Sequence, residues 1–252
     1  MLNVIYTELY KLKRTNVLWL IIIGAAVPAL LNLLVELEHL EWDEFFYNNL
    51  IFFTVLTGPA LFTLMGGYVV AREYTERTVN QLFVYPYRRF TLMFGKLIVI
   101  LIMMIATFSL NFILVILSGN FISDELLTGA IFREYAGVYL WMLALMALTI
   151  PMAMTAGIVG KSYIPPIVLG VVAILIAMMV FSGVEDTNSS RIILGSYVPF
   201  GSMVVHMADL MGKSNVAVGN YLHALYPHGI AFVLFFTFNV IYYSRSEVHS
   251  GS

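Results

Sequence analysis

Residues 97–117, LIVILIMMIATFSLNFILVIL, form a stretch of 21 residues, none of which is charged. A helix of this length rises about 32 Å, close to the roughly 30 Å hydrocarbon core of a bilayer. The whole composition agrees, since 60% of the 252 residues are hydrophobic and 11% are charged, against about 25% charged in a soluble domain. The sequence therefore predicts an all-α integral membrane protein.

Six stretches of this kind predict six transmembrane helices in a single domain that covers residues 17–243. We expect the sixth helix to begin before its apolar stretch, near Ala224, with a break at Pro227. No Asp, Glu, Lys or Arg lies inside the six stretches, which argues against an ion-coupled carrier, an intramembrane metalloprotease and a voltage sensor. The stretches are 17–35, 50–71, 97–117, 135–159, 164–183 and 229–243.

The basic residues favour one orientation. If the amino terminus is cytoplasmic, ten basic residues lie on the inner face and three on the outer face, which fits the positive-inside rule. We therefore expect both termini in the cytoplasm, with residues 244–252 as a short tail. The long outer loop, 184–227, contains at 198–211 a pattern typical of a short helix on or dipping into the outer interface. The inner set is Lys11, Lys13, Arg14, Arg72, Arg77, Arg88, Arg89, Lys96, Lys161 and Arg245.

Residues 1–16 precede the first span and have a pattern of their own. Four apolar residues recur there near helical spacing, and basic residues follow them. This pattern predicts an amphipathic helix that lies in the membrane interface and leads into the first span. We expect this helix to be an anchor rather than a binding site. The apolar residues are Leu2, Ile5, Leu9 and Leu12.

The segment between the second and third spans, residues 72–90, is REYTERTVNQLFVYPYRRF. Glu73 stands four residues before Arg77, which is the favourable order for an ion pair on a helix. We therefore expect the second span to continue as a polar helical extension on the cytoplasmic side.

A second, short helix is predicted within the same segment. Thr78 and Gln81 form a capping-box pattern at its start, and Pro86 ends it. This helix has one apolar face, and two interpretations are open. It docks in a groove of another protein, or it lies on the lipid headgroups. In the second interpretation, lipid phosphate contacts Arg88, Arg89 and Lys96.

The sequence has no clear catalytic or metal-binding pattern. Gly160-Lys161-Ser162 resembles the end of a phosphate-binding loop, but that motif needs a glycine where Thr155 stands. The chain has no cysteine, which excludes thiolate chemistry. Of its five histidines, His206 could share a helical face with Asp209, but lone histidines in outer loops are usually not metal ligands. We expect no ATP site, catalytic residue, cofactor or metal in this chain.

The six spans, the amphipathic amino-terminal helix and segment 72–90 together resemble the permease subunit of type-2 ABC exporters. Members of this family carry a Glu after the second span, then a Thr, a polar-apolar helix, and a Pro followed by an Arg. Tyr74 after Glu73 and the absence of Gly before Thr78 are most similar to the bacitracin- and lantibiotic-resistance permeases. The matching positions here are Glu73, Tyr74, Thr78, Gln81, Leu82, Pro86 and Arg88.

The resemblance implies that segment 72–90 is a coupling helix whose seven matching residues contact a separate ATPase subunit. Two ATPase subunits, which bind ATP and Mg²⁺, and a second permease, either the same chain or a paralogue, would complete the transporter. Its implied role is export of a hydrophobic or amphipathic antimicrobial peptide or drug from the bacterial cytoplasmic membrane, for resistance or lantibiotic immunity. Other functions stay open, namely a scaffold or sensor subunit without transport and a passive channel. An intramembrane enzyme is disfavoured because no ionisable residue lies inside the predicted spans.

Overall fold

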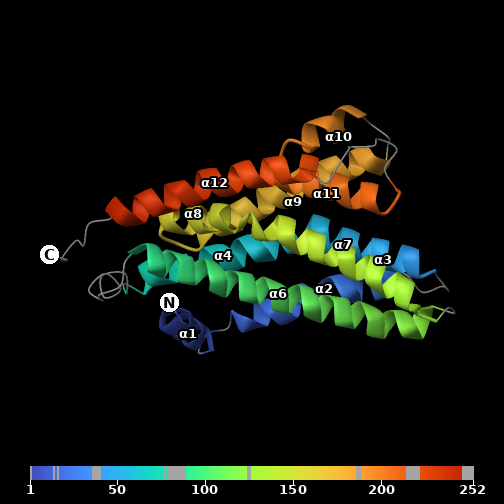
Figure 1. The fold of residues 1–252 in the computed structure, drawn as a ribbon, viewed down its shortest axis with the longest axis horizontal. Coiled ribbons are helices and arrows are strands. Elements are labelled where there is room, and N and C mark those ends of the chain that lie inside the picture. Colours follow the sequence, from blue (N-terminus) through green and yellow to red (C-terminus); the bar gives the residue numbers. More distant parts are fainter. Residues whose placement is uncertain are drawn as a thin grey trace.

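The chain folds into a bundle of α-helices, most of which run along the longest dimension of the molecule (Figure 1). In this computed structural model, the described residues contain no β-strand. The structure describes residues 2–13, 15, 17–35, 41–76, 78, 89–123, 126–185, 189–213 and 222–245. The helices are α1 (Leu2–Lys13), α2 (Leu18–Val35), α3 (Trp42–Ile51), the π-helix η1 (Phe52–Thr57), α4 (Gly58–Thr75), α6 (Arg89–Ile122), α7 (Gly129–Ala147), α8 (Ile150–Gly160), α9 (Ile164–Glu185), α10 (Ser189–Gly195), α11 (Pro199–Leu210) and α12 (Leu222–Arg245).

Six helical segments are long and apolar enough to cross a membrane, which confirms the predicted number of spans. Each coincides with one of the predicted stretches, and all but the first extend beyond it. The six segments are Leu18–Val35, Trp42–Thr75, Phe90–Ile122, Gly129–Gly160, Ile164–Glu185 and His223–Ser244.

The second span shows why the predicted spans are shorter than the observed ones. It begins at Trp42 rather than at residue 50. Asp43 and Glu44 favour a solvated loop in the sequence, but Trp42 beside them is 1% exposed. The carboxylate of Asp43 accepts a hydrogen bond from the Tyr135 hydroxyl on α7. These acidic residues therefore belong to the end of a helix whose opposite face is apolar and buried.

The predicted break in the sixth span is wrong. α12 is one helix from Leu222 to Arg245, and it includes Pro227. Pro227 lies within its first two turns, where the missing N–H removes one backbone hydrogen bond without ending the helix. The expected early start near Ala224 is confirmed, because the helix already begins at Leu222.

Helix α1 and the carboxyl end of α12 lie at one end of the bundle, together with the carboxyl end of α4 and the amino end of α6 (Figure 1). We call this the terminal end. The helices α3, α7, α10 and α11 lie toward the opposite end, which we call the far end. The terminal end therefore holds the two helix ends that flank the predicted coupling helix.

The predicted short helix in the last loop is present as α11. All nine residues from Phe200 to Ala208 are buried, and α11 packs against α9 and α12. The expectation of a helix at an interface therefore left out its main contacts, which are with the rest of the protein.

The predicted amino-terminal helix is present as α1, which packs against α6. Its buried side chains are Val4, Glu8 and Leu12, spaced four residues apart. Of the four residues predicted to form its apolar face, Leu12 is buried, while Ile5 and Leu9 are partly buried. The buried face is rotated from the prediction because it includes a charged residue, Glu8, which has a partner inside the bundle.

Candidate functional site

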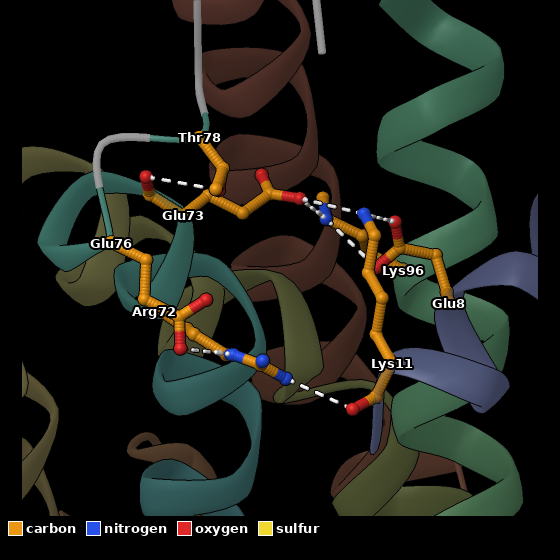
Figure 2. A network of polar contacts seen from close by, with 7 residues as sticks. All are labelled: Glu8, Lys11, Arg72, Glu73, Glu76, Thr78 and Lys96. Carbon is orange, nitrogen blue, oxygen red and sulfur yellow. Dashed lines mark hydrogen bonds and ion pairs between the residues drawn. The ribbon is translucent and has the colours of Figure 1, made fainter. Parts of the chain in front are cut away.

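Four charged side chains meet where α1, α4 and α6 come together (Figure 2). Lys96 on α6 donates hydrogen bonds to Glu8 on α1, at 3.0 Å, and to Glu73 on α4. The Lys11 ammonium nitrogen on α1 lies 2.7 Å from a carboxylate oxygen of Glu8 and 3.6 Å from one of Glu73. We call Glu8, Lys11, Glu73 and Lys96 the ion cluster.

The ion cluster is largely buried. Lys96 is 0% exposed, Glu73 5% and Glu8 6%, while 39% of the Lys11 side chain is exposed. Burying a charge without a partner is costly. Here two carboxylates face two ammonium groups, so the charges balance. Because Lys96 on α6 pairs with Glu8 on α1 and with Glu73 on α4, the cluster links these three helices.

Glu8 lies on α1, outside the spans, and is ionised at neutral pH. Burial acts to raise the pKa of its carboxyl group. The nearby ammonium groups of Lys96 and Lys11, with their hydrogen bonds, outweigh burial and hold this pKa below its ordinary value. The Glu8 carboxylate therefore remains a negatively charged partner for both lysines.

Further contacts hold the chain where it leaves α4. Arg72 Nη1 donates to the backbone oxygen of Lys11 at 3.1 Å, and Arg72 Nε donates to Glu76 at 2.7 Å. Just beyond α4, the backbone N–H of Thr78 donates to the carbonyl oxygen of Glu73 at 2.9 Å, and the Thr78 hydroxyl lies 3.4 Å from the same oxygen. These contacts tie the last turn of α4 to α1 and fix the direction of the chain at Thr78.

Three of the seven predicted contact residues lie in the described part of the chain. Glu73 is buried in the ion cluster, Tyr74 is partly buried against the core, and Thr78 bonds to the end of α4. The contact of the seven residues with an ATPase remains a prediction. The other four, which lie outside the described residues together with the predicted coupling helix itself, are Gln81, Leu82, Pro86 and Arg88.

The structure gives Glu73 partners that the sequence pattern did not indicate. Its predicted partner, Arg77, lies outside the described residues. The carboxylate pairs with Lys96 and Lys11 on other helices, and the four-residue ion pair on α4 joins Arg72 to Glu76 instead. Glu73 is therefore a contact between helices rather than a local stabiliser of its own helix.

Two expectations about Lys96 are wrong. A contact with lipid phosphate requires an exposed ammonium group, and Lys96 is 0% exposed. The expectation of spans without charged residues also fails, because Glu73 and Lys96 lie within the observed spans Trp42–Thr75 and Phe90–Ile122. Both charges are tolerated because they pair with each other inside the protein.

Glu8 is the site residue that sequence reasoning missed. It stands four residues after Val4 and four before Leu12, so it occupies the middle of a buried helical face. An acidic residue in that position indicates a basic partner inside the bundle. The sequence carries this signal, but it does not show which lysine is the partner.

The other candidate motifs have structural explanations. Gly160-Lys161-Ser162 lies in the predicted turn between α8 and α9, where Lys161 has φ of 49°. A Cβ atom on Gly160 would overlap the ring of Pro165. This glycine therefore allows the tight turn to close, and the tripeptide does not follow a strand as a phosphate-binding loop does.

The contact between His228 and Ser202 is not that of an activated nucleophile. His228 Nδ1 lies 2.8 Å from the carbonyl oxygen of Ala224, a contact that places the imidazole proton on Nδ1. This nitrogen, 3.3 Å from the Ser202 hydroxyl, cannot also accept the proton of that hydroxyl. The described residues contain no group of three His, Asp or Glu side chains arranged to hold a metal ion.

A comparison with known protein families identifies the family of this chain. Residues 4–180 match the family model described as ABC-2 family transporter protein. The chain belongs to this family. A curated relative, the bacitracin transport permease protein BCRB of Bacillus licheniformis, is 24% identical over 142 residues, which cover 56% of this chain and 68% of the relative. Residues 4–180, which match the family model, include all four residues of the ion cluster.

This ABC-2 family member is the permease subunit of an ABC transporter and a multi-pass protein of the bacterial cell membrane. The six spans agree with that assignment. Membership of the family implies, in general, an ABC ATPase as partner. The ion cluster of the ABC-2 permease then lies between the helices on either side of the predicted ATPase contact.

Proposed function

We propose that this chain is the transmembrane subunit of an ATP-driven exporter that moves a hydrophobic or amphipathic antimicrobial peptide out of the membrane. ATP and Mg²⁺ bind to a separate ATPase subunit. Two ATPase subunits and a second permease, either another copy of this chain or a paralogue, complete the transporter. Both termini and segment 72–90 face the cytoplasm in this arrangement.

The observation that carries the proposal is the ion cluster. Lys96 joins the end of α4 to the start of α6, and these are the helices that flank residues 79–88. Through Glu8 it also holds α1. A force applied to residues 79–88 by the ATPase therefore reaches three helices together, because a single buried ammonium group bonds to the other two.

Within this proposal, Glu73 has a positioning role. Its carboxylate is buried and points toward Lys96 (Figure 2), so it links the end of α4 to α6. Contact with the ATPase is made by the remaining predicted residues, which lie at and beyond the end of α4. They are Tyr74, Thr78, Gln81, Leu82, Pro86 and Arg88.

The substrate class rests on the relative. That protein is named as a bacitracin transport permease, and bacitracin is therefore the first compound to test. Cells that express this chain together with its ATPase should tolerate more bacitracin than cells that express either subunit alone. Equal sensitivity of all three strains to bacitracin and to other membrane-active peptide antibiotics would contradict the proposed substrate class.

The coupling role is tested by purification and ATP hydrolysis. The tagged chain is purified from host membranes, and we expect an ATPase subunit with a phosphate-binding loop to co-purify. In nanodiscs, Glu73→Ala should lower bacitracin-stimulated ATP hydrolysis several-fold without reducing membrane insertion or the amount of ATPase bound. The matched control is Glu44→Ala, which removes an exposed carboxylate at the far end of the same span. If Glu73→Ala left ATP turnover unchanged, the coupling role would be wrong.

A further inference from the structure

Two of the six spans are interrupted partway along their length, and the first interruption is a π-helix. In the second span, η1 (Phe52–Thr57) separates α3 from α4. The N–H of Gly58 bonds to the carbonyl oxygen of Phe53, five residues back, and the Thr57 hydroxyl donates to the carbonyl oxygen of Phe52 at 3.1 Å. A π-helix inserts one extra residue into the helical ladder and is less regular than the helices on either side.

The second interruption lies in the fourth span. α7 ends at Ala147, α8 begins at Ile150, and the two residues between them form a turn. Pro151 has no N–H to continue the hydrogen-bond ladder. The hydroxyl of Thr149 donates to the carbonyl oxygen of Met146 at 2.8 Å. At each interruption, a threonine hydroxyl thus donates a hydrogen bond to a backbone carbonyl. The carbonyl oxygen therefore has a hydrogen-bond partner in the membrane even where the helix is interrupted.

The two interruptions touch each other. A Cβ atom on Gly58, the residue after η1, would lie 2.5 Å from the methyl carbon of Met146, which stands two residues before the start of the turn in the fourth span. In Figure 1, α3 and α7 lie toward the far end, and α4 and α8 lie toward the terminal end. Both spans are therefore interrupted at the same level of the bundle, where they face one another.

On the terminal side of this level, α4, α8 and α9 pack almost backbone to backbone. A Cβ on Gly157 of α8 would lie 2.6 Å from the carbonyl oxygen of Gly67 on α4, and one on Gly66 would lie 2.7 Å from Ala153. A Cβ on Gly67 would overlap the ring of Pro166 on α9. Such close packing leaves little freedom between these three helices, so they form one rigid unit.

On the far side, a buried network of polar side chains ties a different set of helices. The Asn49 amide on α3 donates to Asn111 on α6 at 3.0 Å and to the Tyr139 hydroxyl on α7 at 2.6 Å. The Asn111 amide donates to the carbonyl oxygen of Ala25 on α2 at 2.9 Å. These bonds hold α2, α3, α6 and α7 together, and none of their residues belongs to the α4–α8–α9 unit.

We infer that the second and fourth spans pivot together at their facing interruptions, so that the α4–α8–α9 unit moves as one body relative to the α2–α3–α6–α7 unit. The ion cluster accommodates this motion, because Glu73 at the end of α4 has two ammonium partners, Lys96 and Lys11. The carboxylate retains a positive neighbour as α4 shifts. The pivot itself follows from the geometry, and it rests on the proposed function only for the source of the force.

The expected displacement is large enough to measure. α4 contains 18 residues, which corresponds to about 27 Å at the rise of an α-helix. A tilt of about 10° at η1 would therefore move the end of α4 by about 5 Å. Spin-label distances resolve such a change, and the chain has no native cysteine to interfere with labelling.

Three pairs of exposed labelling sites test the pivot in the isolated chain in nanodiscs. Thr75→Cys with Val159→Cys lies within the α4–α8–α9 unit. Leu34→Cys with Arg133→Cys lies within the other unit, and Trp19→Cys with Val159→Cys joins the two. The distance distribution of the joining pair should be about twice as broad as those within the units, because its labels sit on bodies that tilt relative to one another. Equal widths for all three pairs would overturn the pivot.

Straightening the two spans gives a second test. Deletion of Leu56 removes the extra residue of η1, and Pro151→Ala restores an N–H in the fourth span. The doubly altered protein should show a joining-pair distribution as narrow as those within the units. Pro227→Ala is the control, since it removes a proline from α12, which is one continuous helix, and should leave the width unchanged. An equally broad distribution after straightening would contradict the pivot, and the comparison of the three pairs does not depend on this variant folding.

Addition of the ATPase subunit separates the pivot from the proposed function. Trapping the complex with ATP and vanadate should shift the distances of the joining pair toward one end of their distribution. This result would support both the pivot and the proposed coupling. A broad distribution that nucleotide does not shift would support the pivot and contradict the proposed coupling. A shift of similar size within the α4–α8–α9 unit would overturn the pivot, because that unit would then not be rigid.

Discussion

Replacing Lys96 by Met removes one ammonium group from the ion cluster while nearly preserving the volume of the side chain. Two buried carboxylates, Glu8 and Glu73, then share one partly exposed lysine, Lys11. Breaking a buried ion pair by removing one partner costs about 3–5 kcal/mol. Because Lys11 still faces both carboxylates, we expect about 3 kcal/mol, the lower end of that range. For a chain of this size, that loss lowers Tm by about 6–12 °C.

The loss of stability in Lys96→Met should depend on pH, and it should become smaller as the pH falls. The pKa of Glu8 is lowered in the folded protein, so its pairing contributes stability above its unfolded pKa of about 4.3, and this contribution is lost as pH falls through the folded pKa. Without Lys96, burial of Glu8 is opposed less strongly, and its pKa rises. The Tm difference between wild type and Lys96→Met should therefore be largest near neutral pH and should shrink as pH is lowered toward ~4.

Thermal unfolding in nanodiscs at several pH values measures both effects. Lys161→Met, which removes an exposed lysine from the turn between α8 and α9, is the matched control and should leave Tm unchanged. Adding Glu8→Gln to Lys96→Met restores charge balance and should recover part of the loss. If Lys96→Met lowered Tm no more than Lys161→Met at neutral pH, the ion cluster would not stabilise the bundle, and the reasoning above would be refuted.

Two further substitutions test the packing on either side of the pivot. Gly67→Ala should lower Tm, because the added methyl group overlaps Pro166 and overpacking costs about 1–3 kcal/mol, whereas Gly137→Ala, with open space around its Cβ position, should not. Asn111→Leu leaves the buried Asn49 amide without one of its partners and should cost about 1–3 kcal/mol. Thermal unfolding checks both, and unchanged Tm values would show that the close packing and the polar network do not hold the two units.

The sequence is sufficient to predict the number of spans, because each span is an apolar run of bilayer length. It is less informative about their ends, where charged residues have partners inside the protein. Asp43 extends the second span because it accepts a hydrogen bond from Tyr135, 92 residues away. Lys96 lies inside the third span because it pairs with Glu8, 88 residues away. Such distant pairings have no local pattern, so runs of hydropathy cannot show them.

In the candidate site, too, the sequence shows the local motif but not the distant partners. The resemblance to a family motif indicates Glu73, but its buried partners, Lys96 and Lys11, lie on other helices and depend on how α1, α4 and α6 pack together. The π-helix η1 has no sequence pattern of its own either, since its residues, FFTVLT, are typical of any apolar span. Its extra residue is recognised from backbone hydrogen bonds, which depend on how the flanking helices pack.

The central claim is that residues 79–88 receive work from an ATPase on the cytoplasmic side. A photo-crosslinker placed at Leu82 in the full chain, in membranes that also contain the ATPase subunit, tests this most directly. The account predicts a crosslink to the ATPase from position 82 and none from Tyr226, an exposed residue near the start of α12, used as the control. Absence of the crosslink at Leu82, or reaction of Leu82→Cys with an impermeant reagent added from outside intact cells, would contradict the account.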